Sequence, residues 1–167
     1  QALYSSLCHS VYGGWRAWPK ELKNPQSPEV KKFKTENRKA VNFFKFLQYW
    51  AEKQLEDVQK KIEERGLKIG LYRDLPVGLC KDSAELWSEN DLFIKDCGAG
   101  APPDIFFPTG QKWCLGAFNP YKLKANAYRP FIKILRAAME NAGAIRIDHV
   151  MSLQRLYIIP DASEKGT

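Results

Sequence analysis

The stretch Ala144-Ile-Arg-Ile-Asp-His-Val-Met151 joins a short β-branched run to a charged cluster of an arginine, an aspartate and a histidine. A helical pattern over residues 129–141 precedes it and is expected to end at Gly143, because glycine is favoured just after a helix. The order is therefore helix, turn, strand and then Asp148 at the carboxyl end of the strand. Catalytic side chains of α/β barrels lie at that end of the strands. The stretch predicts a barrel strand with Asp148 at its mouth.

Arg146 and Asp148 are two residues apart, so on an extended strand they face the same side, about 6.5 Å apart along the axis. A guanidinium at that range favours the ionised carboxylate, which is the form that a nucleophile requires. The alternative is a structural ion pair at a strand end, since such pairs are common. His149 is expected to point to the opposite face and to pack there.

A second helix and strand come earlier in the chain. Ser27 is a good N-cap before a helix whose apolar residues recur at helical spacing until Gly66 ends it. Residues 67–71 then read as a buried strand that leads to Asp74. Helix, strand, long excursion, helix and strand is the order of a parallel crossover unit. Burial on two sides is expected for four aromatic residues in the middle of the long helix: Phe43, Phe46, Tyr49 and Trp50.

The excursion over residues 76–127 is far longer than an ordinary βα loop, which indicates a functional insertion. Its Pro102-Pro103 and Gly110 predict a stiff, sharply turned loop. Ser83 or Asp82 is expected to cap a short helix, and Trp87 is expected to pack in the core.

Composition restricts the class of protein. A chain of 167 residues that is 44% hydrophobic can form a sizeable core. The net charge of +7 raises the possibility of a nucleic-acid partner, but the basic residues alternate with glutamates along the long helix and predict a solvated face instead. The four cysteines, Cys8, Cys80, Cys97 and Cys114, are too widely spaced for a zinc site or a dense disulfide framework and indicate free cytoplasmic thiols. No apolar run is long enough to suggest a membrane span.

Five motifs follow one another along the chain. Their occurrence together and in this order identifies a family more specifically than any single motif does. They are Gly70-Leu-Tyr-Arg-Asp-Leu-Pro-Val-Gly78, Asp82-Ser-Ala-Glu-Leu-Trp87, Gly100-Ala-Pro-Pro-Asp-Ile-Phe-Phe-Pro-Thr-Gly-Gln-Lys-Trp113, Tyr128-Arg-Pro-Phe131 and Arg146-Ile-Asp-His149. Over nearly its whole length the chain resembles the amylomaltases, the bacterial 4-α-glucanotransferases that disproportionate maltodextrins.

This resemblance implies an α/β fold, namely a part of a (β/α)8 barrel of several hundred residues. The chain is then an internal fragment that covers about strands 3 and 4. We expect a helical segment and strand 3 over residues 1–74, an insertion subdomain over 75–127, and a helix, strand 4 and a following loop over 128–167. Unpaired strand edges of such a fragment favour self-association.

The resemblance also implies roles for individual residues. Asp148 matches the nucleophile, Arg146 orients it, and Asp74 supports the nucleophile strand or binds a sugar hydroxyl; the alternative for Asp74 is a cap on the following turn. Gln111 and Trp113 match a loop that covers acceptor sugars. Asp104 either binds a sugar hydroxyl or holds the turn of its loop.

The implied activity is the transfer of α-1,4-glucan segments between maltodextrins by a retaining double displacement, without a metal or an organic cofactor. The family's general acid/base glutamate matches no residue up to Thr167, so the isolated chain is expected to be inactive. The alternatives are an α-amylase-type glucan hydrolase and, for the isolated chain, a non-catalytic glucan-binding fragment. Nucleic-acid and membrane partners are not expected.

Overall fold

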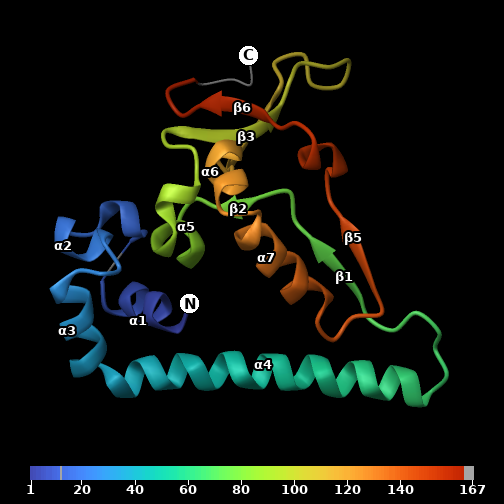
Figure 1. Cartoon of the computed structure of the whole chain (residues 1–167), viewed down its shortest axis with the longest axis horizontal. Helices are drawn as coiled ribbons and strands as arrows, with labels where there is room; N and C mark the ends of the chain where they lie inside the picture. The colour runs from blue at the N-terminus through green and yellow to red at the C-terminus, as the bar shows by residue number, and fades with distance from the viewer. Residues whose placement is uncertain (12, 164–167) are drawn as a thin grey trace.

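The computed structural model describes residues 1–11 and 13–163, which form a helical N-terminal half and two separate β-sheets (Figure 1). The N-terminal half consists of α1 (Ala2–Ser10), the 3₁₀ helix η1 (Trp15–Ala17), α2 (Lys20–Lys23), α3 (Pro28–Glu36) and α4 (Arg38–Glu64). The strands are β1 (Tyr72–Leu75), β2 (Leu79–Cys80), β3 (Cys97–Ala101), β4 (Gln111–Gly116), β5 (Ala144–Ile147) and β6 (Tyr157–Pro160). Between them lie α5 (Ala84–Ser88), η2 (Asn90–Leu92), α6 (Pro120–Ala125), α7 (Arg129–Met139) and η3 (Val150–Leu153).

The long predicted helix begins at the expected cap but is divided into two helices. The Ser27 hydroxyl accepts a hydrogen bond from the amide of Val30 at 3.1 Å, and α3 starts at the next residue. Asn37 separates α3 from α4 and has a non-helical backbone conformation, with φ of −103° and ψ of 30°. Its side-chain amide donates to the carbonyl of Phe33 at 3.1 Å, in addition to the ordinary helical bond from its backbone amide to that carbonyl. Asparagine competes with helical hydrogen bonding in this way. The expectation of one continuous helix is therefore wrong, whereas Gly66, with φ of +72°, ends α4 as predicted.

The middle of α4 is open to solvent. Figure 1 shows α4 along one edge of the molecule, where α1 packs against it, and the ring of His9 lies 6.3 Å from that of Phe44. Val41 is the buried residue of α4. The predicted burial of its central aromatic residues is wrong for this chain, because no described element covers them and about half of each is exposed: Phe43, Phe46, Tyr49 and Trp50.

The first strand of the parallel pair lies later than predicted. Residues 67–71 are not a strand, and Leu67 and Ile69 are exposed. Gly70 has φ of +78°, which lies outside the β region. The strand β1 therefore begins only at Tyr72, and it pairs in parallel with β5 as the crossover pattern predicted.

Gly143 has a different role from the one predicted. The helix α7 ends at Met139, and the left-handed residue after it is Asn141, with φ of +53°. A Cβ on Gly143 would lie 1.3 Å from the carbonyl oxygen of Ile69. The amide of Gly143 also donates to the carbonyl of Leu71 at 3.0 Å. Glycine is needed here because two backbones approach closely, and not because it ends the helix.

The second sheet is antiparallel and has the strand order β2-β4-β3-β6. Its strand β6 follows β5 in the chain and pairs with β3, with Ile158 opposite Ala99 (Figure 1). Residues 79–116 thus share a sheet with a strand from the segment 128–167. The chain segment between β5 and β6 connects the two sheets.

The main hydrophobic cluster joins the N-terminal helices to α5. It consists of Tyr4, Leu7, Trp18, Val30, Ala84 and Trp87. The indole N–H of Trp87 donates to the carbonyl of Leu22 at 2.9 Å, and the Ser83 hydroxyl caps α5 by accepting from the amide of Leu86 at 3.3 Å. Of the two caps that the sequence left open, Ser83 and Asp82, the structure shows Ser83, and the predicted core position of Trp87 is confirmed.

The parallel sheet has two strands, so one edge of β1 and one edge of β5 lack a strand partner among the described residues. Self-association through these edges stays a prediction. No helix in the described part of the chain has the length and apolar character needed to cross a lipid bilayer.

We expect Gly143→Ala to lower the free energy of unfolding by about 1–3 kcal/mol, because the new methyl group displaces the backbone near Ile69. Urea denaturation of the chain measures the loss. Gly66→Ala is the matched control: it also adds a methyl group, but nothing lies within 4 Å of it, so only the left-handed backbone is strained. A loss for Gly143→Ala no larger than that of Gly66→Ala would contradict the close approach.

We expect the chain to lose stability at alkaline pH because the buried Tyr4 side chain ionises on unfolding. Burial raises the pKa of Tyr4 well above its usual range, and a hydrogen bond with the Cys8 thiol raises it further. The folded chain therefore favours the neutral phenol. Its contribution to the free energy of unfolding is fully present below the unfolded-state pKa of about 10 and is lost as the pH rises above that value towards the folded-state pKa. Urea denaturation at about pH 8 and at about pH 11 measures the free energy of unfolding at each pH. The loss between the two should be smaller for Tyr4→Phe than for the unsubstituted chain. The exposed Tyr121→Phe is the control and should behave like the unsubstituted chain.

Candidate functional site

Asp74 and Asp148 lie at the carboxyl ends of neighbouring parallel strands. The register of β1 and β5 places Asp74 opposite Arg146. The amide of Asp148 donates to the carbonyl of Leu75 at 3.0 Å, so strand pairing continues one residue beyond β5 and holds Asp148 at the sheet edge. In α/β barrels this edge carries the functional side chains.

Arg146 joins the two aspartates. Its Nη1 lies 2.9 Å from Oδ2 of Asp74, and its Nη2 lies 2.6 Å from Oδ1 of Asp148. A guanidinium is a planar fork of donors, so one side chain can hold two carboxylates in fixed orientations. The sequence predicted the contact with Asp148. The contact with Asp74 depends on the strand register, which no local pattern shows.

The three side chains are accessible. Between 41% and 53% of each is exposed. The second oxygen of each carboxylate accepts no hydrogen bond from a described residue. Because solvent screens ion pairs of this kind, they contribute little to stability. The arrangement is suited to positioning two carboxylates for an incoming ligand.

Gln111 and Trp113 lie together on the strand β4, whereas the resemblance implied that they belong to a loop. The indole N–H of Trp113 donates to the side-chain oxygen of Gln111 at 3.2 Å. The ring of His149 meets the ring of Trp113 edge-on, with centroids 5.1 Å apart and an interplanar angle of 80°. His149 has φ of +45°. It packs, as expected, but sequence reasoning missed that its partner is Trp113, and it thereby links the Asp148 segment to β4.

Asp104 holds the turn of its own loop. Its Oδ1 accepts from the amides of Phe106 and Phe107 at 2.8 and 2.7 Å. Of the two roles considered for Asp104, the structure shows this one. Its hydrogen bonds to described residues stay within the loop, and the adjacent Ile105 and Phe106 are 88% and 83% exposed.

No group of three or more histidine, cysteine, aspartate or glutamate residues in the described part of the chain is arranged to hold a metal ion. The four cysteines are free thiols. The functional groups that the structure brings together at the candidate site are two carboxylates and a guanidinium at one strand edge, with an indole and an amide on β4.

Comparisons with known proteins cover the whole chain. A family model described as 4-alpha-glucanotransferase matches residues 1–167. A 4-alpha-glucanotransferase of Haemophilus influenzae is 41% identical over 147 residues, which are 88% of this chain and 21% of that protein. One of Mycobacterium tuberculosis is 36% identical over 162 residues, which are 97% of this chain and 22% of that protein. The chain thus spans about a fifth of the length of these curated relatives.

Solved structures agree on the fold. The amylomaltase of Streptococcus agalactiae in complex with acarbose superposes with a TM-score of 0.91 at 18% identity, over 99% of this chain and 34% of that one. The amylomaltase of Corynebacterium glutamicum superposes with a TM-score of 0.79 at 25% identity, over 99% of this chain and 21% of that one. The predicted α/β fold, a part of a (β/α)8 barrel with a long insertion, is confirmed.

Arg146→Lys is expected to lower the free energy of unfolding by less than about 1 kcal/mol, because the ion pairs that it weakens are half-exposed. Urea denaturation of the two chains measures this difference. A loss of several kcal/mol would show instead that the guanidinium holds the fold together, which would contradict a positioning role.

Proposed function

The chain belongs to the 4-alpha-glucanotransferase family, and on that basis we propose that the protein containing it transfers α-1,4-glucan segments between maltodextrins. The observation that carries this proposal is the Arg146 guanidinium, which orients Asp74 and Asp148 at the ends of adjacent parallel strands. A retaining transfer needs such an oriented, accessible carboxylate as its nucleophile.

In the first step Asp148 attacks the anomeric carbon of a bound glucan. The bond from that carbon to the glycosidic oxygen breaks, and the leaving glucan takes a proton from a general acid. The donor segment stays attached to Asp148 as a covalent ester. Oδ2 of Asp148 is suited to the attack, because Arg146 holds Oδ1 and no described residue donates to Oδ2.

In the second step the 4-hydroxyl of another glucan attacks the same carbon. The ester bond to Asp148 breaks, and the residue that acted as the acid now removes the proton, so the configuration is retained. No described glutamate forms a hydrogen bond or ion pair with the Arg146 cluster. We therefore assign the acid/base role to a carboxyl group from another strand of the full-length barrel.

The remaining site residues are assigned to positioning and binding. Arg146 orients the nucleophile, and Asp74 holds Arg146 from the neighbouring strand or binds a sugar hydroxyl. Trp113 offers a ring face to a pyranose and Gln111 an amide to its hydroxyls, which favours an acceptor sugar over water. Asp104 shapes the loop before them.

The proposal also covers the domain division of the chain and the cellular location of the protein. We assign residues 1–74 to a helical segment and barrel strand 3, residues 75–127 to an insertion subdomain, and residues 128–167 to a barrel helix, strand 4 and a following loop, whose β6 pairs with β3 of the insertion. We also assign the protein to the cytoplasm, where its free thiols stay reduced.

The test is the conversion of maltotriose by the full-length protein and its Asp148→Asn variant. The unsubstituted protein should form glucose and a ladder of longer maltodextrins. Asp148→Asn should lower this rate by at least about 10³-fold, because an amide cannot act as the nucleophile. Asp57→Asn, a remote aspartate on the exposed face of α4, is the control and should leave the rate unchanged.

The product pattern distinguishes the alternatives. Only shortened sugars from the full-length protein would identify a hydrolase. No turnover, but saturable binding of maltotriose, would leave a glucan-binding protein. An Asp148→Asn variant that keeps its transfer rate would remove Asp148 from the mechanism.

A further inference from the structure

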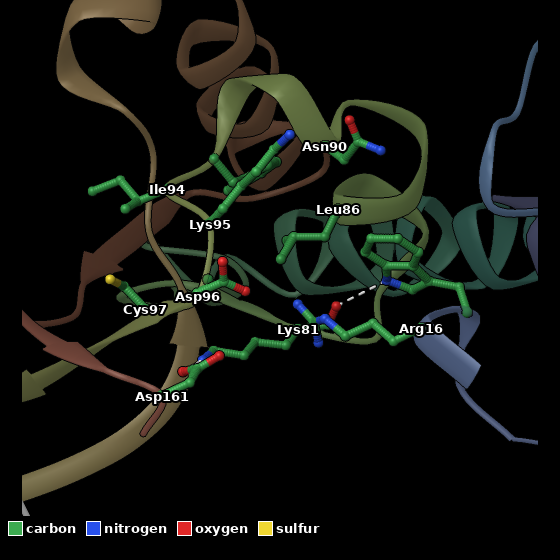
Figure 2. Close-up of a pocket in the computed structure, with 12 residues that line it drawn as sticks. Arg16, Lys81, Leu86, Asn90, Ile94, Lys95, Asp96, Cys97 and Asp161 are labelled. Carbon is green, nitrogen blue, oxygen red and sulfur yellow. Dashed lines mark hydrogen bonds and ion pairs between the residues drawn. The ribbon is translucent and has the colours of Figure 1, made fainter. Parts of the chain in front are cut away.

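A pocket lies away from the Arg146 cluster, between the N-terminal helices and the antiparallel sheet (Figure 2). Its volume is about 280 Å³, and segments that are far apart in the sequence line it, from η1 to the residue after β6. None of the candidate catalytic or acceptor residues belongs to its lining. Its Gly116 is at the opposite end of β4 from Gln111, about 17 Å along the strand.

Apolar surface forms the smaller part of the pocket lining. Leu86 and Phe93 lie there with most of their side chains buried, and Gly116 contributes no side chain. The half-buried indole of Trp15 forms part of the wall, and its N–H donates to the carbonyl of Lys81 at 3.0 Å, as the dashed line in Figure 2 shows. This hydrogen bond fixes the orientation of the ring.

The cations at the pocket are each paired with a carboxylate. Arg16 lies 3.5 Å from Asp82, and Lys95 lies 4.0 Å from Asp91. Lys81 pairs with Asp161, also visible in Figure 2. Each cation thus has a carboxylate beside it, which disfavours a phosphate or another polyanion as the ligand.

Two polar groups of the lining are unengaged. Among the described residues, nothing forms a hydrogen bond or ion pair with the side chains of Asn90 and Asp96, and both line the pocket. The backbone of Asp96 is held, because its carbonyl accepts from the amide of Asp161 at 2.8 Å and its φ is +53°. An amide and a carboxylate together offer both donors and acceptors to hydroxyl groups.

We propose that this pocket binds a short neutral oligosaccharide, namely the end of an α-1,4-glucan. The smaller, apolar part of the lining contacts C–H groups of a pyranose, and the larger polar part, including the unengaged amide and carboxylate, binds its hydroxyls. The volume lies just below the usual range for ligand pockets, which limits the bound part to one or two sugar rings. The choice of an α-1,4-glucan rests on the proposed function, and the site would hold a glucan away from Asp148.

Trp15 and Trp113 report separately on binding at two places, since Trp15 lines the pocket and Trp113 lies at the proposed acceptor region. The experiment is a titration of the full-length protein, labelled with ¹⁵N in its tryptophan indoles, with maltotriose, followed through the indole N–H signals. We expect a saturable shift of the Trp15 signal. Asn90→Ala and Asp96→Asn should each weaken the affinity that Trp15 reports by about threefold to tenfold, because the first removes hydrogen bonds to the sugar and the second replaces a charged acceptor with a weaker neutral one.

Asn42→Ala is the matched control, because Asn42 is an exposed residue of α4 far from the pocket. It should leave the Trp15 titration unchanged. A Trp15 signal that does not move at millimolar maltotriose would overturn the proposal, as would one that moves more with inorganic phosphate than with maltotriose. If the full-length protein fails to disproportionate maltotriose while Trp15 still reports saturable binding, the proposed function falls and the pocket assignment stands.

Discussion

The parallel pairing of β1 with β5 is the constraint on which the candidate site depends. This pairing sets Asp74 opposite Arg146, and the backbone ladder then reaches one residue further, to Asp148. A shift of the register by one residue would turn alternate side chains to the other face and separate the guanidinium from Asp74. Gly143 makes the pairing possible, because only a residue without Cβ lets the backbone near Ile69 approach this closely.

The antiparallel sheet holds the chain segment that follows Asp148. After Asp148 the chain turns at His149, which has a left-handed backbone, and passes through η3 to β6. Since β6 pairs with β3, the segment that carries Asp148 is anchored at both ends, in the parallel sheet before it and in the antiparallel sheet after it. The edge-on contact of His149 with Trp113 then joins this segment to β4. An aromatic ring and a carboxylate that are distant in the sequence thus come to one region.

Local signals in the sequence predicted local structure well. The cap at Ser27, the stop at Gly66, the cap at Ser83 and the buried Trp87 are all found in the structure. One local prediction failed, since Asn37 divides the long helix, and the other failures concern burial or close approach. The apolar residues at 67–71 and the aromatic residues of α4 have the composition of buried segments, but no described element covers them.

The sequence by itself determined the family, the helix limits set by capping residues, and the placement of Arg146 and Asp148 on one side of a strand. These features depend on neighbours within a few residues, where the backbone geometry fixes the distances. Only the tertiary structure decided the link from Arg146 to Asp74, the contact of His149 with Trp113, the return of β6 to the sheet and the pocket beside Trp15. Each of these joins segments whose separation depends on strand register and on the path of the chain, which no short pattern of residues encodes.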